Sequence, residues 1–99
     1  MLHIINKSPF HTSTLQSALN IAQAGDAVLL IEDGVYAATS GSAVESVVLQ
    51  AAGKVKFHVL KPDADARGLA DRLLQGMTTV DYGGFVDLVA EHRTSHSWL

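Results

Sequence analysis

The sequence predicts one α/β domain in which a small parallel β-sheet carries helices on both faces. Short apolar runs alternate with segments whose apolar residues recur at helical spacing. The run at residues 27–31, Ala-Val-Leu-Leu-Ile, is continuous, as in strands that a parallel sheet buries on both faces. The chain has 99 residues, so we expect a single domain over residues 1–99.

Four strands alternate with helices along the chain, and glycine, proline or acidic residues mark most of the boundaries. We expect a helical turn at residues 35–39 and a third helix that loosens at Gly68. The helices are expected to begin after Thr12 or Ser13, at about Ala43, near Pro62 and near Phe85. The strands are predicted at residues 2–5, 27–31, 55–60 and 77–81.

This alternation predicts right-handed crossovers between parallel strands. The expected strand order of the four-stranded sheet is 2-1-3-4, as in flavodoxin-like folds. Ligands of such sheets bind beyond the carboxyl ends of the strands, at the point where the order reverses. The loop from Asn6 to Thr14 and the loop after Leu60 lie at that edge, so both are candidate binding segments.

The composition indicates apolar surface that other subunits bury. Hydrophobic residues make up 47% of the chain, and charged residues make up only 17%. Ordinary domains are about 25% charged, and a chain of this size can hide only part of its surface in its own core. The core is either unusually large for the length, or part of the apolar surface is buried against other protein chains, and we favour the second.

Charge and hydropathy exclude several other classes of protein. The net charge is −3 and the pI is near 5.9, whereas nucleic-acid-binding domains are usually basic. No apolar run approaches the roughly 20 residues that span a bilayer. The first six residues lack the charged start and apolar stretch of a signal peptide. We expect a cytoplasmic protein that does not bind nucleic acid or membrane.

The hydroxyl-rich loop Ser8–Thr14 precedes a predicted helix and allows two interpretations. Free N–H groups at a helix N-terminus attract anions, which favours a small-ligand site for a phosphate or a flavin phosphate. The simpler interpretation is a capped helix, because the loop lacks the glycines that let a backbone approach a phosphate. The ligand-binding interpretation stays open as the alternative function.

Other candidate chemical groups have plain structural interpretations. The pair Glu32–Asp33 could serve as a general acid or base, but Asp33 followed by Gly34 is typical of a turn. His92 and His96 are four residues apart without an obvious third metal ligand. His3 and His58 fall in predicted strands and are expected to be packed or hydrogen-bonded. The sequence contains no Gly-x-Ser-x-Gly nucleophile elbow. We predict no catalytic residue, no metal and no cofactor.

The chain contains no cysteine, so it cannot carry sulfur or any other group on a thiol. This absence gains meaning from a resemblance that runs in order along the whole chain. Its first parts are Met1-Leu2-His3 with Ser8-Pro9, Gly25-Asp26, Val28–Val35 with Ala37-Ala38, and Lys54-Val55. Its later parts are Ala66–Leu69, Asp81-Tyr82, Phe85-Val86, Leu88, His92 and Trp98. With these residues the chain resembles the TusB/DsrH family of sulfur-relay subunits.

The resemblance implies a small DsrEFH-like α/β fold and a place in a hetero-oligomer. Such subunits assemble with TusC-like and TusD-like companions as a dimer of heterotrimers. The complex passes persulfide sulfur from a TusA-like donor to a TusE-like acceptor. The sulfur goes to the 2-position of the wobble uridine in tRNA, during 5-methylaminomethyl-2-thiouridine synthesis. The persulfide cysteine lies on the TusD-like subunit, which implies a non-catalytic role for this chain.

Aromatic and apolar residues that follow the second and fourth predicted strands, together with the near-terminal tryptophan, are the candidate contacts with partners. Aromatic residues are enriched at the cores of protein interfaces, and Trp98 is the only tryptophan. The apolar excess also predicts homo-oligomers when partners are absent. The predicted interface residues are Val35, Tyr36, Tyr82, Phe85 and Trp98, with a core position as the simpler interpretation of Phe85.

Overall fold

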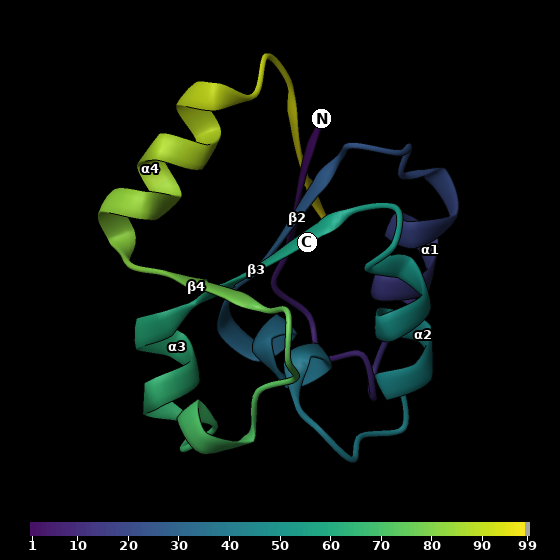
Figure 1. Cartoon of the computed structure of the whole chain (residues 1–99), viewed down its shortest axis with the longest axis vertical. Coiled ribbons are helices and arrows are strands. Elements are labelled where there is room, and N and C mark those ends of the chain that lie inside the picture. The colour runs from purple at the N-terminus through teal and green to yellow at the C-terminus, as the bar shows by residue number, and fades with distance from the viewer. Residues whose placement is uncertain (99) are drawn as a thin grey trace.

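The computed structural model describes residues 1–98 and has a five-stranded parallel sheet with helices on both faces (Figure 1). This confirms the predicted α/β class. The strands are β1 (Leu2–Ile5), β2 (Ala27–Leu30), β3 (Lys56–Leu60), β4 (Thr78–Val80) and β5 (Ser95–Trp98). The α-helices are α1 (Thr14–Ile21), α2 (Glu45–Ala51), α3 (Lys61–Ala66) and α4 (Tyr82–Glu91), and the 3-10 helices are η1 (Glu32–Ala38) and η2 (Ala70–Arg72).

The strand order is β4-β3-β2-β1-β5, so the predicted order 2-1-3-4 is wrong, as is the prediction of four strands. β2 lies between β1 and β3, and β5 occupies the other edge of β1. The residues of β5, Ser-His-Ser-Trp, have no apolar alternation that would mark them as a strand. β1 pairs in register with β5 from Leu2 opposite Ser95 to Ile5 opposite Trp98.

The sheet is most apolar at β1 and β2, two of its three inner strands, which are covered on both faces. Every residue of β1 and β2 is buried, including His3. Because successive side chains of a strand point to opposite faces, each of these strands contributes to two separate cores. β4, at one edge, has two exposed threonines and a half-buried valine.

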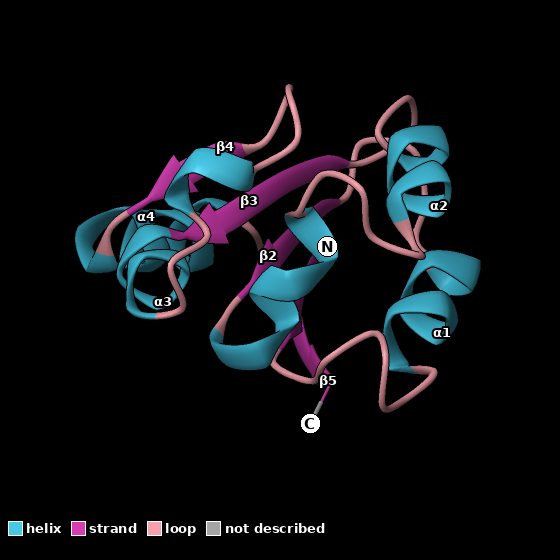
Figure 2. Cartoon of the chain, turned by 90° about the horizontal axis from the view of Figure 1, so that it is seen from below, coloured by secondary structure: helices cyan, strands magenta, loops and turns pink. Residues whose placement is uncertain are grey.

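The two faces of the sheet are covered unequally (Figure 2). We call the face under α1 and α2 the helix-pair face, and the face under α4 the single-helix face. The core of the single-helix face consists of Leu2, Ile4, Ala27, Leu29 and Leu88. The core of the helix-pair face consists of Ile5, Leu15, Ala18, Ala22, Val28, Leu30, Val35, Ala37, Ala38, Val48, Val55, Phe57, Val59, Ala64, Leu69 and Leu74.

Several helices differ in detail from their predicted limits. The turn expected at 35–39 is part of η1, and the third helix ends near Gly68, whose φ of 68° is left-handed. α4 begins before the expected Phe85, because the Asp81 carboxylate accepts the Gly84 N–H and caps the helix. Within residues 1–98, no helix is long and apolar enough to cross a membrane.

Candidate functional site

The carboxyl edge of the sheet holds a groove between two aromatic side chains, Phe10 and Tyr36. One cavity of about 200 Å³ lies between these rings, Thr39 and Arg72. A second, of about 360 Å³, lies on the Ser8 side of the same two rings. Phe10 is half exposed, and Tyr36 packs partly against the core of the helix-pair face. This edge is the one at which the sequence placed its candidate binding loops.

η1 sits tightly against the end of β1 because of one glycine. A Cβ atom on Gly34 would fall well inside the van der Waals distance of the Ile5 carbonyl oxygen. The Gly34 N–H donates to the Ile31 carbonyl oxygen, and the Ile31 N–H donates to the Ile5 carbonyl oxygen. The turn after β2 therefore folds back over β1, and this places Tyr36 beside the loop that carries Phe10.

The acidic residues at this edge are engaged in structural contacts. Glu32 has a left-handed backbone with φ of 48°, and its N–H donates to the Asp63 carboxylate at 2.6 Å. The Arg67 guanidinium donates to the Asp33 carboxylate, with Nη2 3.0 Å from Oδ1, and to the Asp63 carbonyl oxygen. These contacts join η1 to α3. They favour the turn interpretation of Asp33–Gly34 over an acid–base role.

The loop that precedes α1 uses its polar groups within itself. The Ser8 hydroxyl accepts the Phe10 N–H, and the Ser8 carbonyl oxygen accepts the His11 and Thr12 N–H groups and the Thr12 hydroxyl. Ser13 makes no side-chain capping bond to α1 within the described residues. The internal turn accounts for these hydroxyls, so the geometry gives the phosphate or flavin alternative no support.

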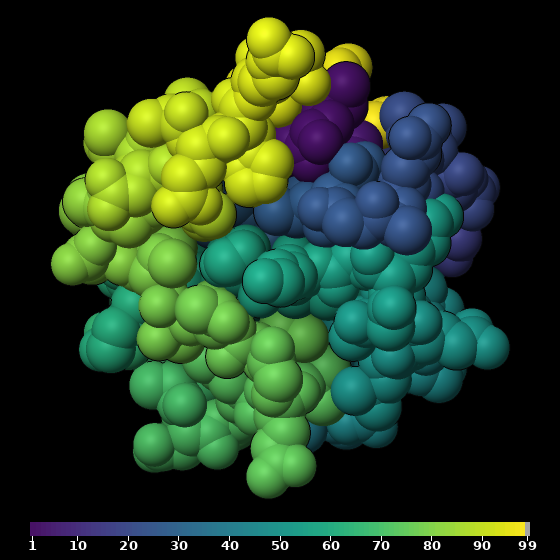
Figure 3. Space-filling view, turned by 45° about the horizontal axis from the view of Figure 1, so that its top comes forward, coloured from purple at the N-terminus to yellow at the C-terminus, as the bar shows by residue number. Residues whose placement is uncertain are grey.

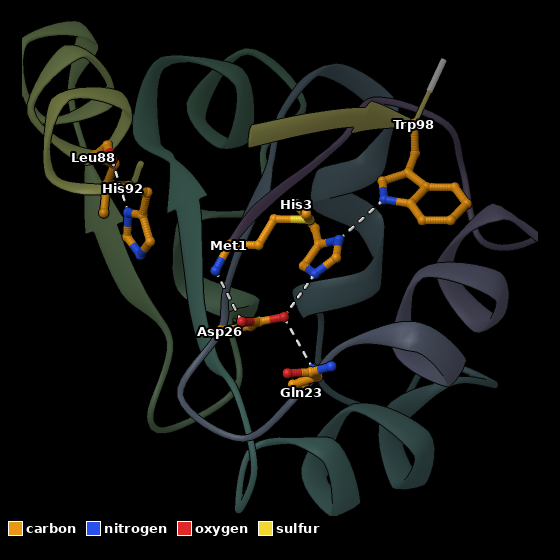
Figure 4. A network of polar contacts seen from close by, with 7 residues as sticks. All are labelled: Met1, His3, Gln23, Asp26, Leu88, His92 and Trp98. Atoms are coloured by element: carbon orange, nitrogen blue, oxygen red, sulfur yellow. Dashed lines mark hydrogen bonds and ion pairs between the residues drawn. The ribbon is translucent and has the colours of Figure 1, made fainter. Parts of the chain in front are cut away.

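A partly buried polar chain ties β1 to β5 and runs from Asp26, just before β2, to Trp98 at the end of β5 (Figure 4). The indole N–H of Trp98 donates to Nδ1 of His3 at 3.2 Å. That bond leaves the proton of a neutral His3 ring on Nε2, which donates to the Asp26 carboxylate at 3.0 Å. Asp26 also accepts the Gln23 N–H and pairs with the terminal ammonium of Met1 at 2.9 Å. His3 is hydrogen-bonded, as predicted.

Two side chains have pKa values that are shifted from their usual range. The Gln23 N–H, with the Met1 ammonium and His3, holds the pKa of the Asp26 carboxyl far below its usual range, against the opposing effect of burial. Burial lowers the pKa of His58, and the positive charges of Lys56 and His92 lower it further. Nδ1 of His58 is buried and makes no hydrogen bond within residues 1–98.

The predicted interface residues lie in different environments. Val35 has no exposed surface in the isolated chain, which removes it as a contact residue. Tyr36 lines both cavities of the groove, and Trp98 is partly buried over His3. Tyr82 is 62% exposed on α4, whereas Phe85 packs partly against the core of the single-helix face. The structure does not join these residues into one patch.

Sequence reasoning missed Phe10 and the pairing of His3 with Asp26. The available signal for Phe10 was the presence of one aromatic residue in the otherwise polar loop Ser8–Thr14. Nothing local could have linked His3 to Asp26, because the two are 23 residues apart. No group of three His, Asp or Glu side chains within residues 1–98 could hold a metal ion.

The family model described as "DsrH like protein" matches residues 7–95 of this chain. The chain belongs to the DsrH family. This confirms the resemblance found in the sequence. Among relatives, the DsrH-like chain is 37% identical to Protein TusB of Pectobacterium parmentieri, and 39% identical to Protein TusB of Enterobacter sp. (strain 638). Each alignment spans 98 residues, which is 99% of this chain and 100% of the relative.

Solved structures share the fold of this DsrH-family chain at lower identity. The ychN protein from E. coli superposes with a TM-score of 0.81 at 17% identity, and 97% of each chain is covered. MTH1491 from Methanobacterium thermoautotrophicum, a protein of unknown function, has a TM-score of 0.75 at 21% identity, with 97% of this chain and 95% of that chain covered. At these identities the likeness shows the fold alone.

Proposed function

We propose that this DsrH-family chain is a non-catalytic subunit of a sulfur-relay complex that serves the 2-thiolation of the wobble uridine of tRNA. The observation that carries the proposal is full-length similarity to TusB proteins in a chain without cysteine. A persulfide needs a cysteine sulfur as its carrier, so this chain cannot hold the cargo itself. It can position the subunits that do.

The carboxyl edge of the sheet supports a bracing role. Its acidic residues hold η1 against α3, and its loop hydroxyls satisfy the turn before α1. Phe10 and Tyr36 are left as the aromatic lining of an open groove. Rigid aromatic side chains that cost little entropy to order are typical anchors in protein interfaces.

In this proposal the partners are TusC-like and TusD-like subunits, which join the chain in a cytoplasmic heterohexamer made of two heterotrimers. The assembled complex contacts a TusA-like donor and a TusE-like acceptor, and the chain itself does not contact tRNA. The candidate residues for contacts with these subunits, or with a second copy of the chain, are Tyr36, Tyr82, Phe85 and Trp98. Val35 is left out because it is fully buried.

Deletion of the gene tests the function. Wobble 2-thiouridine is measured by mass spectrometry of digested tRNA, before and after complementation with the wild-type chain. We expect the thiolated nucleoside to fall strongly in the deletion strain and to recover on complementation. Normal thiolation in the deletion strain would contradict the proposal.

Co-purification with TusC-like and TusD-like subunits from the same organism tests the assembly. The variant Phe10→Ser removes one wall of the groove and should weaken the complex. Ile21→Ser is the matched control. Ile21 is a similarly exposed apolar residue, at 59%, but it is at the end of α1 and does not line the groove. Equal loss of binding in both variants would show that the groove has no special part in assembly.

A further inference from the structure

α4 carries three exposed apolar side chains on one flank, which we call the α4 stripe: Tyr82, Val86 and Val89. Their exposed fractions are 62%, 66% and 40%. The spacing of four and then three residues places them in one row along the helix. α4 stands at the margin of the molecule, next to the segment that leads into β5 (Figure 3).

The apolar band of α4 is wider than the sheet can cover. At 100° per residue, Phe85 and Leu88 lie beside the α4 stripe and pack against the core of the single-helix face. Asp87 and Glu91 lie on the opposite flank from the stripe. A helix that packs against one core needs an apolar band of only about 100°, so the extra width indicates a second contact.

The other exposed apolar residues of the described chain are spread over separate elements. Leu49 is on α2, Met1 and Ile21 line one small cavity, and Phe10 lines the groove with Tyr36. Single exposed apolar residues are normal on protein surfaces, whereas contiguous ones mark interaction sites. The α4 stripe differs from these groups in forming a row of three along one helix, which makes it a second candidate interface beside the groove.

We propose that the α4 stripe binds the α4 stripe of a second copy of this chain, with the two helices antiparallel about a two-fold axis. Asp81 caps the N-terminus of α4, and Arg93 follows its C-terminus. Antiparallel pairing brings the Asp81 of each copy toward the Arg93 of the other. It also sets the two helix dipoles antiparallel, so that the positive N-terminus of one helix lies beside the negative C-terminus of the other.

The remaining charges of α4 agree with this arrangement. Asp87 and Glu91 lie on the flank away from the stripe, so the pairing of two stripes leaves these carboxylates on the outer sides of the dimer. A parallel arrangement would instead bring the two Asp81 carboxylates together and the two Arg93 side chains together, which is repulsive. The two-fold contact is closed, so it yields a dimer and not a filament.

Sedimentation equilibrium of the purified chain over a wide concentration range tests the pairing. We expect a reversible monomer–dimer equilibrium for the wild type. Val86→Asp places a charge in the middle of the stripe and should raise the dissociation constant at least tenfold. Leu49→Asp makes the same kind of change at a residue that is 50% exposed on α2, and should leave the constant unchanged. Circular dichroism and thermal melting show that each variant is folded.

Two charge variants test the direction of the helices. Asp81→Asn keeps a good helix cap while it removes the charge, and Arg93→Gln removes the opposite charge. Each should raise the dissociation constant several-fold at low salt, and the difference should shrink in high salt. A wild-type chain that stays monomeric at every concentration would overturn the proposal. So would a dimer that Val86→Asp leaves intact, or one that neither charge variant weakens.

Discussion

The two faces of the sheet differ in how completely they are closed. The helix-pair face holds a large core to which α1, α2, η1 and α3 all contribute. The single-helix face holds a small core under α4, whose outer flank keeps exposed apolar side chains. The helix-pair face can therefore supply most of the stability of the isolated chain. The single-helix face is the one that further protein contacts would complete.

Core truncations should show the largest effect and separate the two faces. Leu30 is fully buried on the helix-pair face, so Leu30→Ala should lower the free energy of unfolding by about 4 kcal/mol. Leu88→Ala on α4 should cost about 2 kcal/mol, because the open flank of that helix lets the site relax. Urea denaturation measures both. Equal losses would show that the two cores contribute alike.

Gly34→Ala should cost about 3 kcal/mol, because the added Cβ atom meets the Ile5 carbonyl oxygen and pushes η1 off the end of β1. The control is Gly53→Ala, where the nearest atom to the new Cβ is 3.8 Å away. Its unfolding free energy should stay within about 0.5 kcal/mol of the wild type. A tolerated Gly34→Ala would mean that η1 shifts freely at the carboxyl edge.

Trp98→Phe should lower the free energy of unfolding by about 1–2 kcal/mol. The variant keeps an aromatic ring against the core of the helix-pair face but leaves Nδ1 of buried His3 without its donor. Thermal melting at neutral pH measures the loss. His96→Phe is the control, because His96 is exposed beside the same tryptophan. A larger loss of stability in His96→Phe than in Trp98→Phe would show that packing between the rings at positions 96 and 98 matters more than the hydrogen bond to His3.

Acid should destabilise the chain in two steps. The pKa of His58 is lowered in the folded state, so the unfolded chain binds a proton first as the pH falls below about 6.5, and stability declines there. The pKa of Asp26 is also lowered, so its contribution is present above pH about 4 and is lost as the pH falls further. His58→Gln should flatten the upper step only. An unchanged profile between pH 7 and 5 would assign that step to another group.

The interior of the fold could be predicted because it depends on local patterns. The run at residues 27–31 indicated a doubly buried strand, and Gly68 was the position at which the third helix was expected to loosen; α3 ends shortly before it, at Ala66. The start of α4 was missed because Gly83 and Gly84 looked like a break, whereas Gly84 fits close to Val80 and donates to the Asp81 cap.

The strand order could not be predicted, because it depends on contacts between distant residues. β5 is polar, and it is held beside β1 by backbone pairing and by a side-chain hydrogen bond between residues 95 positions apart. Of the two loops expected at the carboxyl edge, the loop Asn6–Thr14 supplies one side of the groove, whereas η1 and the residues after it supply much of the rest. The aromatic lining of the groove depends on how closely η1 approaches β1, which no local pattern records.

β5 has a consequence for the solubility of the chain. Its four residues are mostly exposed, yet they cover the outer edge of β1, a strand of wholly buried residues, Leu-His-Ile-Ile. If β5 detaches, β1 presents unpaired backbone groups and apolar side chains at an open edge, which is a template for aggregation. β5 thus protects the edge of β1 from pairing with strands of other molecules. Substitutions that break the hydrogen bond between Trp98 and His3 should therefore cause aggregation on storage under conditions in which the core of the helix-pair face is still folded.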